Sequence, residues 1–213
     1  MSDENVGLID MTRPKGTHLF RAYSMKNRER FEFYYRTQLI EWVRLEFDAG
    51  LIRFVPVNKV FKTAEGRLFV AFKFVYLNSE TLVYFAEPGT DRVVQAFEEY
   101  CSALGMRSKI LGREIINDER FEVWNRFKIL SFIVRWKDEI TAANIKIFVF
   151  SLSHSASCAL SNFDRLDGFG DGRGLAFALE LVRIGKFQLP SLREQLIGGS
   201  TIVVCSSKEM LYE

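Results

Sequence analysis

The sequence has little of the material from which metal and redox sites are most often built. It contains two histidines and three cysteines, and the cysteines, Cys101, Cys158 and Cys205, lie far apart in no CxxC arrangement. The chain therefore has few residues that could form a zinc site of Cys and His ligands or a His-based catalytic triad. An odd number of widely separated thiols among apolar neighbours predicts a reduced, intracellular protein.

The chain also lacks a strong charge excess and a long apolar run. Its formal net charge is only +2, so a basic surface has to come from local clustering. The most apolar stretch, 140–152, is interrupted by Asn144 and Lys146 and falls short of the roughly 20 apolar residues that span a bilayer. The acidic N-terminus is unlike a secretory signal. These features predict a soluble, cytoplasmic protein.

Aromatic and aliphatic residues, by contrast, are abundant. The chain has 213 residues, of which 48% are hydrophobic, and it includes 20 Phe and 7 Tyr. This content argues against disorder and is sufficient for one compact domain or two small ones.

The first half of the chain alternates helical and strand-like patterns. Residues 1–17 are polar and are expected to form an N-terminal tail. Periodicity and turn residues then predict a helix over 33–47, strands over 52–60, 67–77 and 82–86, a helix over 93–104 and a strand over 109–111. This order predicts an α/β fold for residues 18–116, with a mixed sheet flanked by helices.

The second half is dominated by helical patterns. Helices are expected over 121–134 and 174–184, with a short helix over 189–196 and a strand over 201–205, while 142–150 is compatible with either a helix or a strand. Residues 117–213 are therefore expected to form a small, mainly helical domain with a terminal strand or wing.

A basic segment lies near the N-terminus. Its basic residues are opposed only by Glu29, and they are Arg13, Lys15, Arg21, Lys26, Arg28 and Arg30. One interpretation is a solvated basic loop. The other is an arm that contacts DNA phosphates, with Phe20 and Tyr23 interleaved, and such contacts position a protein on a duplex without reading its sequence.

An ordered series of short motifs follows. It consists of Tyr23-Ser24-Met25-Lys26-Asn27, Tyr35-Arg36-Thr37-Gln38, Leu45-Glu46-Phe47-Asp48, Leu51-Ile52-Arg53-Phe54-Val55-Pro56, Ala71-Phe72-Lys73-Phe74-Val75 and Val83-Tyr84-Phe85-Ala86. In order and spacing this series resembles the TnsA-type transposon end-cleaving endonucleases, whose catalytic domain has the restriction-endonuclease fold. More loosely, residues 175–204 resemble the family's second, winged-helix-like domain, which contacts the ATPase regulator of transposition.

The chain departs from this family at its catalytic positions. The resemblance places the helix glutamate at Gln38, the strand aspartate at Lys73, and the glutamate and lysine of the next strand at Tyr84 and Ala86. Enzymes of this fold hold Mg²⁺ with carboxylates and use a lysine to activate water. A lysine at the position of the main metal ligand would repel the ion instead. Lys73 is expected either to point to solvent or to contact a DNA phosphate.

The resemblance therefore implies a TnsA-like component of a DNA transposition machinery. It would be a catalytically inactive nuclease-fold subunit without a metal cofactor, binding transposon-end DNA, a partner transposase and the ATPase regulator. One alternative is an active Mg²⁺-dependent endonuclease with a relocated site at Glu41 and Glu87. A second alternative is a protein-interaction module that binds no DNA.

Two further motifs are given structural interpretations. Ser153-His154-Ser155 is expected to be a polar turn, because no nucleophile elbow accompanies it. The glycine-rich stretch 167–174 lacks the residues of a phosphate-binding or calcium-binding loop, so it is expected to be a mobile connector.

Overall fold

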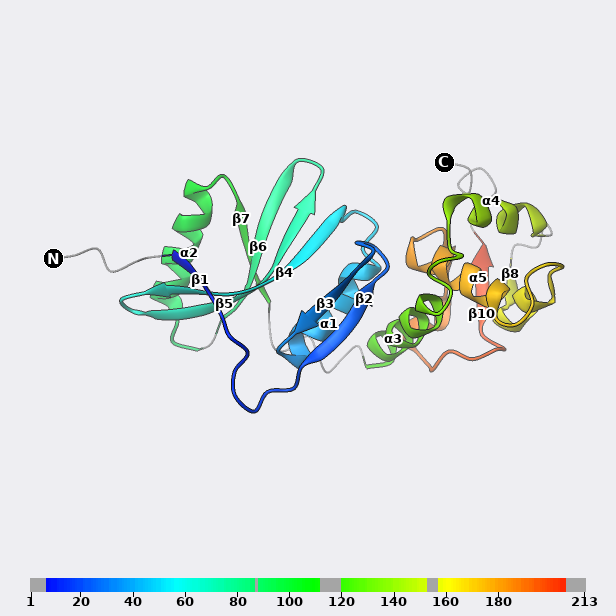
Figure 1. Cartoon of the computed structure of the whole chain (residues 1–213), viewed down its shortest axis with the longest axis horizontal. Coiled ribbons are helices and arrows are strands. Elements are labelled where there is room, and N and C mark those ends of the chain that lie inside the picture. The colour runs from blue at the N-terminus through cyan, green and yellow to red at the C-terminus, as the bar shows by residue number, and fades with distance from the viewer. Residues whose placement is uncertain (1–6, 87, 112–119, 153–156, 206–213) are drawn as a thin grey trace. The chain divides into compact units, whose positions relative to one another are not determined.

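The computed structural model describes residues 7–86, 88–111, 120–152 and 157–205 (Figure 1). The chain divides into two compact units, one formed by residues 1–45 and 50–116 and the other by residues 46–49 and 117–213. Each unit has its own sheet and its own buried aromatic core.

The first unit is built on a five-stranded mixed sheet with the strand order β1-β4-β5-β6-β7. The strands are β1 (Gly7–Asp10), β4 (Arg53–Thr63), β5 (Gly66–Tyr76), β6 (Ser79–Phe85) and β7 (Arg107–Leu111). Neighbouring strands pair antiparallel, except that β7 pairs parallel to β6. A parallel pair needs a long crossover, which α2 (Asp91–Ala103) supplies. The expected α/β class, with a mixed sheet and flanking helices, is confirmed.

The N-terminal region contains more structure than its sequence pattern predicted. Residues 7–10, within the stretch expected to be a tail, form β1 and pair with β4. The basic segment forms a hairpin of β2 (Phe20–Ser24) and β3 (Glu29–Phe33). Because Phe33 belongs to β3, α1 (Arg36–Glu46) begins at Arg36 and not at residue 33.

Each face of the sheet is covered by a different layer. On one face Leu82 and Tyr84 belong to a buried cluster with Phe97 and Cys101 of α2. On the other face, the ring of Phe72 lies 6.1 Å from that of Phe33, which itself lies 5.8 Å from Trp42 of α1. The hairpin and α1 therefore cover the face opposite α2.

A β-bulge in β5 decides which side chains reach which face. Val70 pairs with Tyr84 and Phe72 pairs with Val83, so Ala71 is an extra residue in β5. Directly paired residues share a face, and a bulge shifts the alternation by one residue. Residues after Ala71 consequently point to the opposite face from the one that simple alternation predicts.

The second unit combines helices with a small antiparallel sheet. Its helices are α3 (Arg120–Val134), α4 (Ala142–Ser151) and α5 (Arg173–Arg183), with the 3-10 helices η2 (Leu160–Arg165) and η3 (Pro190–Arg193). The sheet has the order β8-β10-β9, formed by β8 (Ser157–Ala159), β9 (Phe187–Gln188) and β10 (Ile202–Cys205). The ambiguous pattern at 142–150 thus belongs to a helix. Among the helices of the described ranges, none combines the length and the apolarity needed to cross a membrane.

The glycine-rich stretch 167–174 contributes two buried residues to the core of this unit, Phe169 and Gly174, while Asp167, Gly168, Gly170 and Asp171 are exposed. The ring of Phe169 lies 5.1 Å from that of Phe148 and 5.7 Å from that of Phe177. A Cβ atom on Gly174 would lie 2.0 Å from the carbonyl oxygen of Phe163. The connector expected here is therefore anchored to the core at Phe169 and Gly174, and only glycine fits at position 174.

Candidate nucleic-acid interface

Gln38, which the resemblance aligns with a helix glutamate of TnsA-type endonucleases, is a fully buried structural residue. Its Nε2 donates to Oδ1 of Asn58 at 2.7 Å and to the carbonyl oxygen of Ala71 at 3.1 Å. Its Oε1 accepts from the backbone N–H of Tyr34 at 3.1 Å. The amide thus joins α1 to β4 and β5, and it uses two donors where a carboxylate would have none.

Lys73 lies on the opposite face of the sheet from Gln38. It pairs directly with Leu82, which belongs to the cluster against α2, whereas Gln38 reaches the sheet from α1. The Nζ of Lys73 lies 2.7 Å from Oε2 of Glu80, and the two side chains are 33% and 44% exposed. The structure therefore does not bring Gln38 and Lys73 together, and the lysine has an acidic partner of its own.

The two remaining family positions are part of the core. Tyr84 is buried, with its ring 5.1 Å from that of Phe97, and Ala86 packs against the same cluster. Burial, reinforced by the carboxylate of Glu98, raises the pKa of Tyr84. Burial and Glu98 also raise the pKa of Cys101 to about 11, so this free thiol is protonated at neutral pH and is a poor nucleophile.

These positions do not fit a divalent metal ion. Gln38 offers one neutral oxygen that already accepts a hydrogen bond, Lys73 contributes a cation, and Tyr84 and Ala86 lie in an apolar cluster. Mg²⁺ requires several oxygen ligands converging on one point. Across the described residues, no group of three or more His, Cys, Asp and Glu side chains could hold a metal ion.

The alternative site at Glu41 and Glu87 has only one member in the described residues. Glu41 is 8% exposed and lies 3.3 Å from a guanidinium nitrogen of Arg44, so its carboxylate already has a cationic partner. Glu87 and the Ser153-His154-Ser155 motif lie outside the described residues.

The basic segment forms the outer face of the β2–β3 hairpin and the chain before it. Arg21 pairs with Glu32, and Tyr23 pairs with Arg30, in alternation with the buried inward residue Phe31. Most basic side chains of the segment are exposed, namely Arg13, Lys15, Arg21, Arg28 and Arg30. Arg21 lies 2.9 Å from Glu32, which offsets part of the positive charge.

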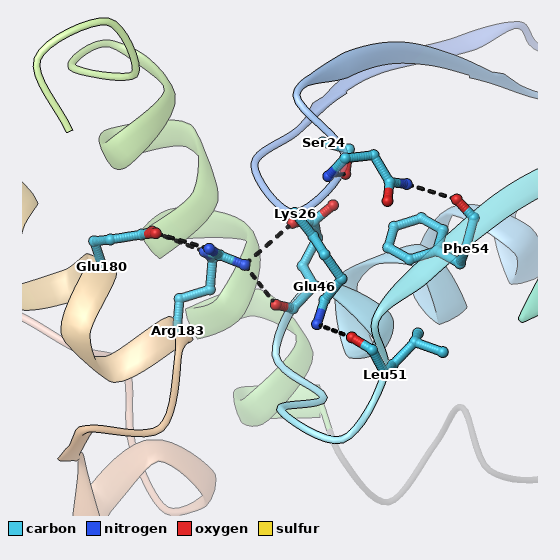
Figure 2. A network of polar contacts seen from close by, with 8 residues as sticks. Ser24, Lys26, Glu46, Leu51, Phe54, Glu180 and Arg183 are labelled. Atoms are coloured by element: carbon cyan, nitrogen blue, oxygen red, sulfur yellow. Dashed lines mark hydrogen bonds and ion pairs between the residues drawn. The ribbon is translucent and has the colours of Figure 1, made fainter. Parts of the chain in front are cut away.

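The turn of this hairpin is anchored to the start of β4 and to the chain just before it (Figure 2). Lys26 is half-buried, and its Nζ donates to the carbonyl oxygen of Leu51 at 2.8 Å. The side-chain amide of Asn27 donates to the carbonyl oxygen of Phe54 at 2.6 Å, and Ser24 Oγ accepts from the backbone N–H of Asn27. Lys26, expected to contact DNA, therefore positions the hairpin that displays the other basic residues.

The hairpin could have been found from the sequence. Charged and aromatic residues alternate from Arg30 to Phe33, which is the period-two pattern of a half-buried strand. This strand pattern was hard to recognise because its last residue, Phe33, also begins the helical pattern predicted over 33–47.

A second polar network lies in the other unit, around α5 (Figure 2). Arg183 is 7% exposed and donates two hydrogen bonds of 2.7 Å to the carboxylate of Glu180. It also donates to the carbonyl oxygen of Glu46 at 2.9 Å. Burial by itself lowers the pKa of Arg183, but Glu180 and Glu46 outweigh this effect and raise it. The guanidinium therefore stays charged inside the unit and has a structural role.

Comparison with known proteins assigns no family to the chain. No family model matches it, and no curated protein matches it significantly. The resemblance to TnsA-type endonucleases therefore rests on the motif series between residues 23 and 86.

Proposed function

We propose that this chain is a TnsA-like component of a DNA transposition machinery that binds DNA without cutting it. One observation carries the proposal. The helix and strands expected from the motif series occur in order as α1, β4, β5 and β6, yet the catalytic positions hold residues with structural partners, above all the buried amide of Gln38. A scaffold retained without its catalytic groups favours binding over strand cutting.

The outer face of the hairpin is the surface proposed to contact DNA. It presents Tyr23 and Arg30, with Arg28 at the turn and Arg21 partly offset by Glu32. Arginine donates well to phosphate oxygens. Such contacts provide affinity and register without sequence selectivity, which suits a subunit that works beside a sequence-specific transposase.

The fold of each unit supports the same proposal. The first unit is proposed to be restriction-endonuclease-like, and the second to be winged-helix-like, because β10 lies between β8 and β9 after the helices η2 and α5. Helix-turn-helix proteins read DNA with their second helix, which would be α5. Residues 176–183 of α5 are all buried, so the second unit is proposed to bind protein partners, a transposase and an ATPase regulator.

A cytoplasmic location is proposed together with this function. Cys101 and Cys158 are free thiols, as expected in a reducing compartment.

A gel-shift titration with a linear duplex at two salt concentrations tests DNA binding. We expect the double variant Arg28→Glu/Arg30→Glu to bind more weakly than the wild type. Its slope of log affinity against log salt should fall by about 2, since each lost phosphate contact removes about 0.9. The matched control is Arg67→Glu/Arg92→Glu, which makes the same charge change at exposed positions of β5 and α2 and should retain the slope.

The absence of duplex binding by the wild type, alone and with the partner transposase, would instead support the protein-interaction module. Strand cutting is tested with supercoiled plasmid in Mg²⁺ or Mn²⁺, with and without the transposase. We expect no nicking by this chain. Nicking that disappears in Glu41→Ala would establish the relocated active site and overturn the proposal.

A further inference from the structure

Helix α3 carries a stripe of exposed aromatic and basic side chains. Phe121 and Trp124 are 43% and 52% exposed. Three- and four-residue spacing, which places side chains on one face of a helix, adds the exposed residues Lys128, Ser131 and, in the turn after the helix, Arg135. The opposite face of α3 carries Ile129 and Ile133, both fully buried. The stripe is therefore an outward-facing surface of the second unit.

The stripe contains no acidic side chain. The acid closest in sequence, Glu122, is buried and forms ion pairs with Arg126 and Arg193. Arg120 is exposed at the start of the helix and adds further positive charge, while Glu194, exposed in the chain beyond η3, offsets part of it. Among the described residues around the two aromatic rings, the basic side chains therefore outnumber the acidic ones.

The chain after η3 is held firmly against this helix. The amide of Asn125 donates to the carbonyl oxygens of Leu192 and Gln195 at 2.8 and 2.7 Å. The Nζ of Lys128 donates to the carbonyl oxygen of Ile197 at 2.7 Å. Residues 192–197 thus form a fixed border beside the stripe. The ring of Phe127 lies 6.1 Å from that of Trp124 and supports the Trp124 ring from one side.

We propose that this stripe binds single-stranded nucleic acid, with bases stacked on Trp124 and Phe121 and the backbone drawn to Lys128 and Arg135. Proteins that bind single strands combine exposed aromatic rings with basic side chains in this way. A polyanion complements the charge of the stripe, and flat aromatic rings exposed beside it favour nucleobases over an acidic peptide. This site lies in a different unit from the hairpin surface and goes beyond the proposed duplex contact.

The test uses the full-length chain and a fluorescein-labelled oligothymidine of about 15 nucleotides, within the range of known single-strand sites. Anisotropy measures affinity, and the part of the tryptophan quenching that disappears in Trp124→Ala reports stacking on Trp124, which is 52% exposed, whereas Trp42 is 4% exposed and Trp136 is only partly exposed. We expect binding with quenched emission. Trp124→Ala should weaken binding by about 5- to 150-fold, the range for the loss of one stacked base, and Phe121→Ala should weaken it in the same direction.

The matched control is Phe150→Ala on α4, which removes a 71% exposed aromatic ring from the same unit and should leave affinity unchanged. Circular dichroism and thermal melting verify that each variant is folded. The hairpin variant Arg28→Glu/Arg30→Glu should lose duplex affinity but retain oligothymidine binding and quenching, which separates this site from the proposed function.

Three outcomes would overturn the inference. The first is that the wild type does not bind oligothymidine at low salt. The second is that a folded Trp124→Ala variant binds oligothymidine as tightly as the wild type does. In the third, poly-glutamate quenches Trp124 and competes as well as oligothymidine does, which would identify the stripe as a surface for acidic proteins.

Discussion

At the residue scale, Gln38 has a structural role at a position where the resemblance to TnsA-type endonucleases leads one to expect a catalytic glutamate. Glutamine and glutamate have nearly the same shape, but only the amide can donate hydrogen bonds. In this chain both donors of Gln38 are used, one by Asn58 and one by the carbonyl oxygen of Ala71. A carboxylate there would face acceptors in a buried setting, where charge is costly.

Gln38→Glu is therefore expected to lower the free energy of unfolding by about 1–3 kcal/mol, the cost of leaving buried acceptors unpaired, and to create no Mg²⁺-dependent nicking. Urea denaturation measures the loss. The control Gln95→Glu makes the same change at an exposed site on α2 and should stay within about 0.5 kcal/mol. A Gln38→Glu variant that is as stable as the wild type and cuts DNA would refute the structural role of this amide.

Arg183 is the second residue whose partners define its role. Arg183→Met would leave Glu180 and Glu46, which are 3% and 1% exposed, without this cation. Breaking a buried pair in this way costs about 3–5 kcal/mol. By comparison, Arg193→Met removes a 74% exposed side chain from Glu122, which also has Arg126 as a partner, and should cost less than about 1 kcal/mol. Equal decreases in the free energy of unfolding of Arg183→Met and Arg193→Met, measured by thermal or chemical denaturation, would contradict this interpretation.

At the element scale, the bulge in β5 separates Lys73 from Gln38. If residues 69–73 alternated regularly, without a bulge, Lys73 would share a face with Phe69, whose ring lies 4.8 Å from that of Tyr35, just before α1. With the bulge, Lys73 shares a face with Leu82 and pairs with Glu80. One inserted residue thus decides that the lysine and Gln38 lie on opposite sides of the sheet.

The start of α5 offers a test of packing at this scale. Gly174→Ala is expected to destabilise the second unit by more than about 2 kcal/mol, because the new Cβ would lie 2.0 Å from the backbone oxygen of Phe163 and backbone clashes belong to the strongly destabilising class. Gly170→Ala is the control, since its nearest atom is the oxygen of Asp164 at 4.0 Å. Hydrogen exchange localises the effect, and similar protection in the two variants would argue against this packing.

At the scale of the whole molecule, the described residues of the two units include no converging set of carboxylates, and we therefore expect no linkage between metal binding and folding. A ligand that binds only the native state raises stability with its concentration. We expect millimolar Mg²⁺ to shift the Tm no more than NaCl of equal ionic strength does. A rise in Tm that is specific to Mg²⁺ or Mn²⁺, measured by calorimetry, would reveal a metal site and reopen the endonuclease hypothesis.

The sequence by itself determined the order of α1, β4, β5, β6 and α2, because hydrophobic periodicity and turn residues act over a few neighbouring positions. It also determined which chemical groups stand at the family positions. It did not show the pairing of β1 with β4, and the strands β8 and β9 were too short for periodicity to show.

Only the tertiary structure decided what the candidate site can do. The strand pairing at the Ala71 bulge, the hydrogen bonds of Gln38 to Asn58 and Ala71, and the anchoring of the hairpin through Lys26 all join residues that are distant in the chain. Local pattern carries no information about such partners, because the face that a side chain reaches depends on strand register and on the layers packed above and below it. The sequence therefore determined the chemical group at each position, whereas the fold determined which residues surround that group.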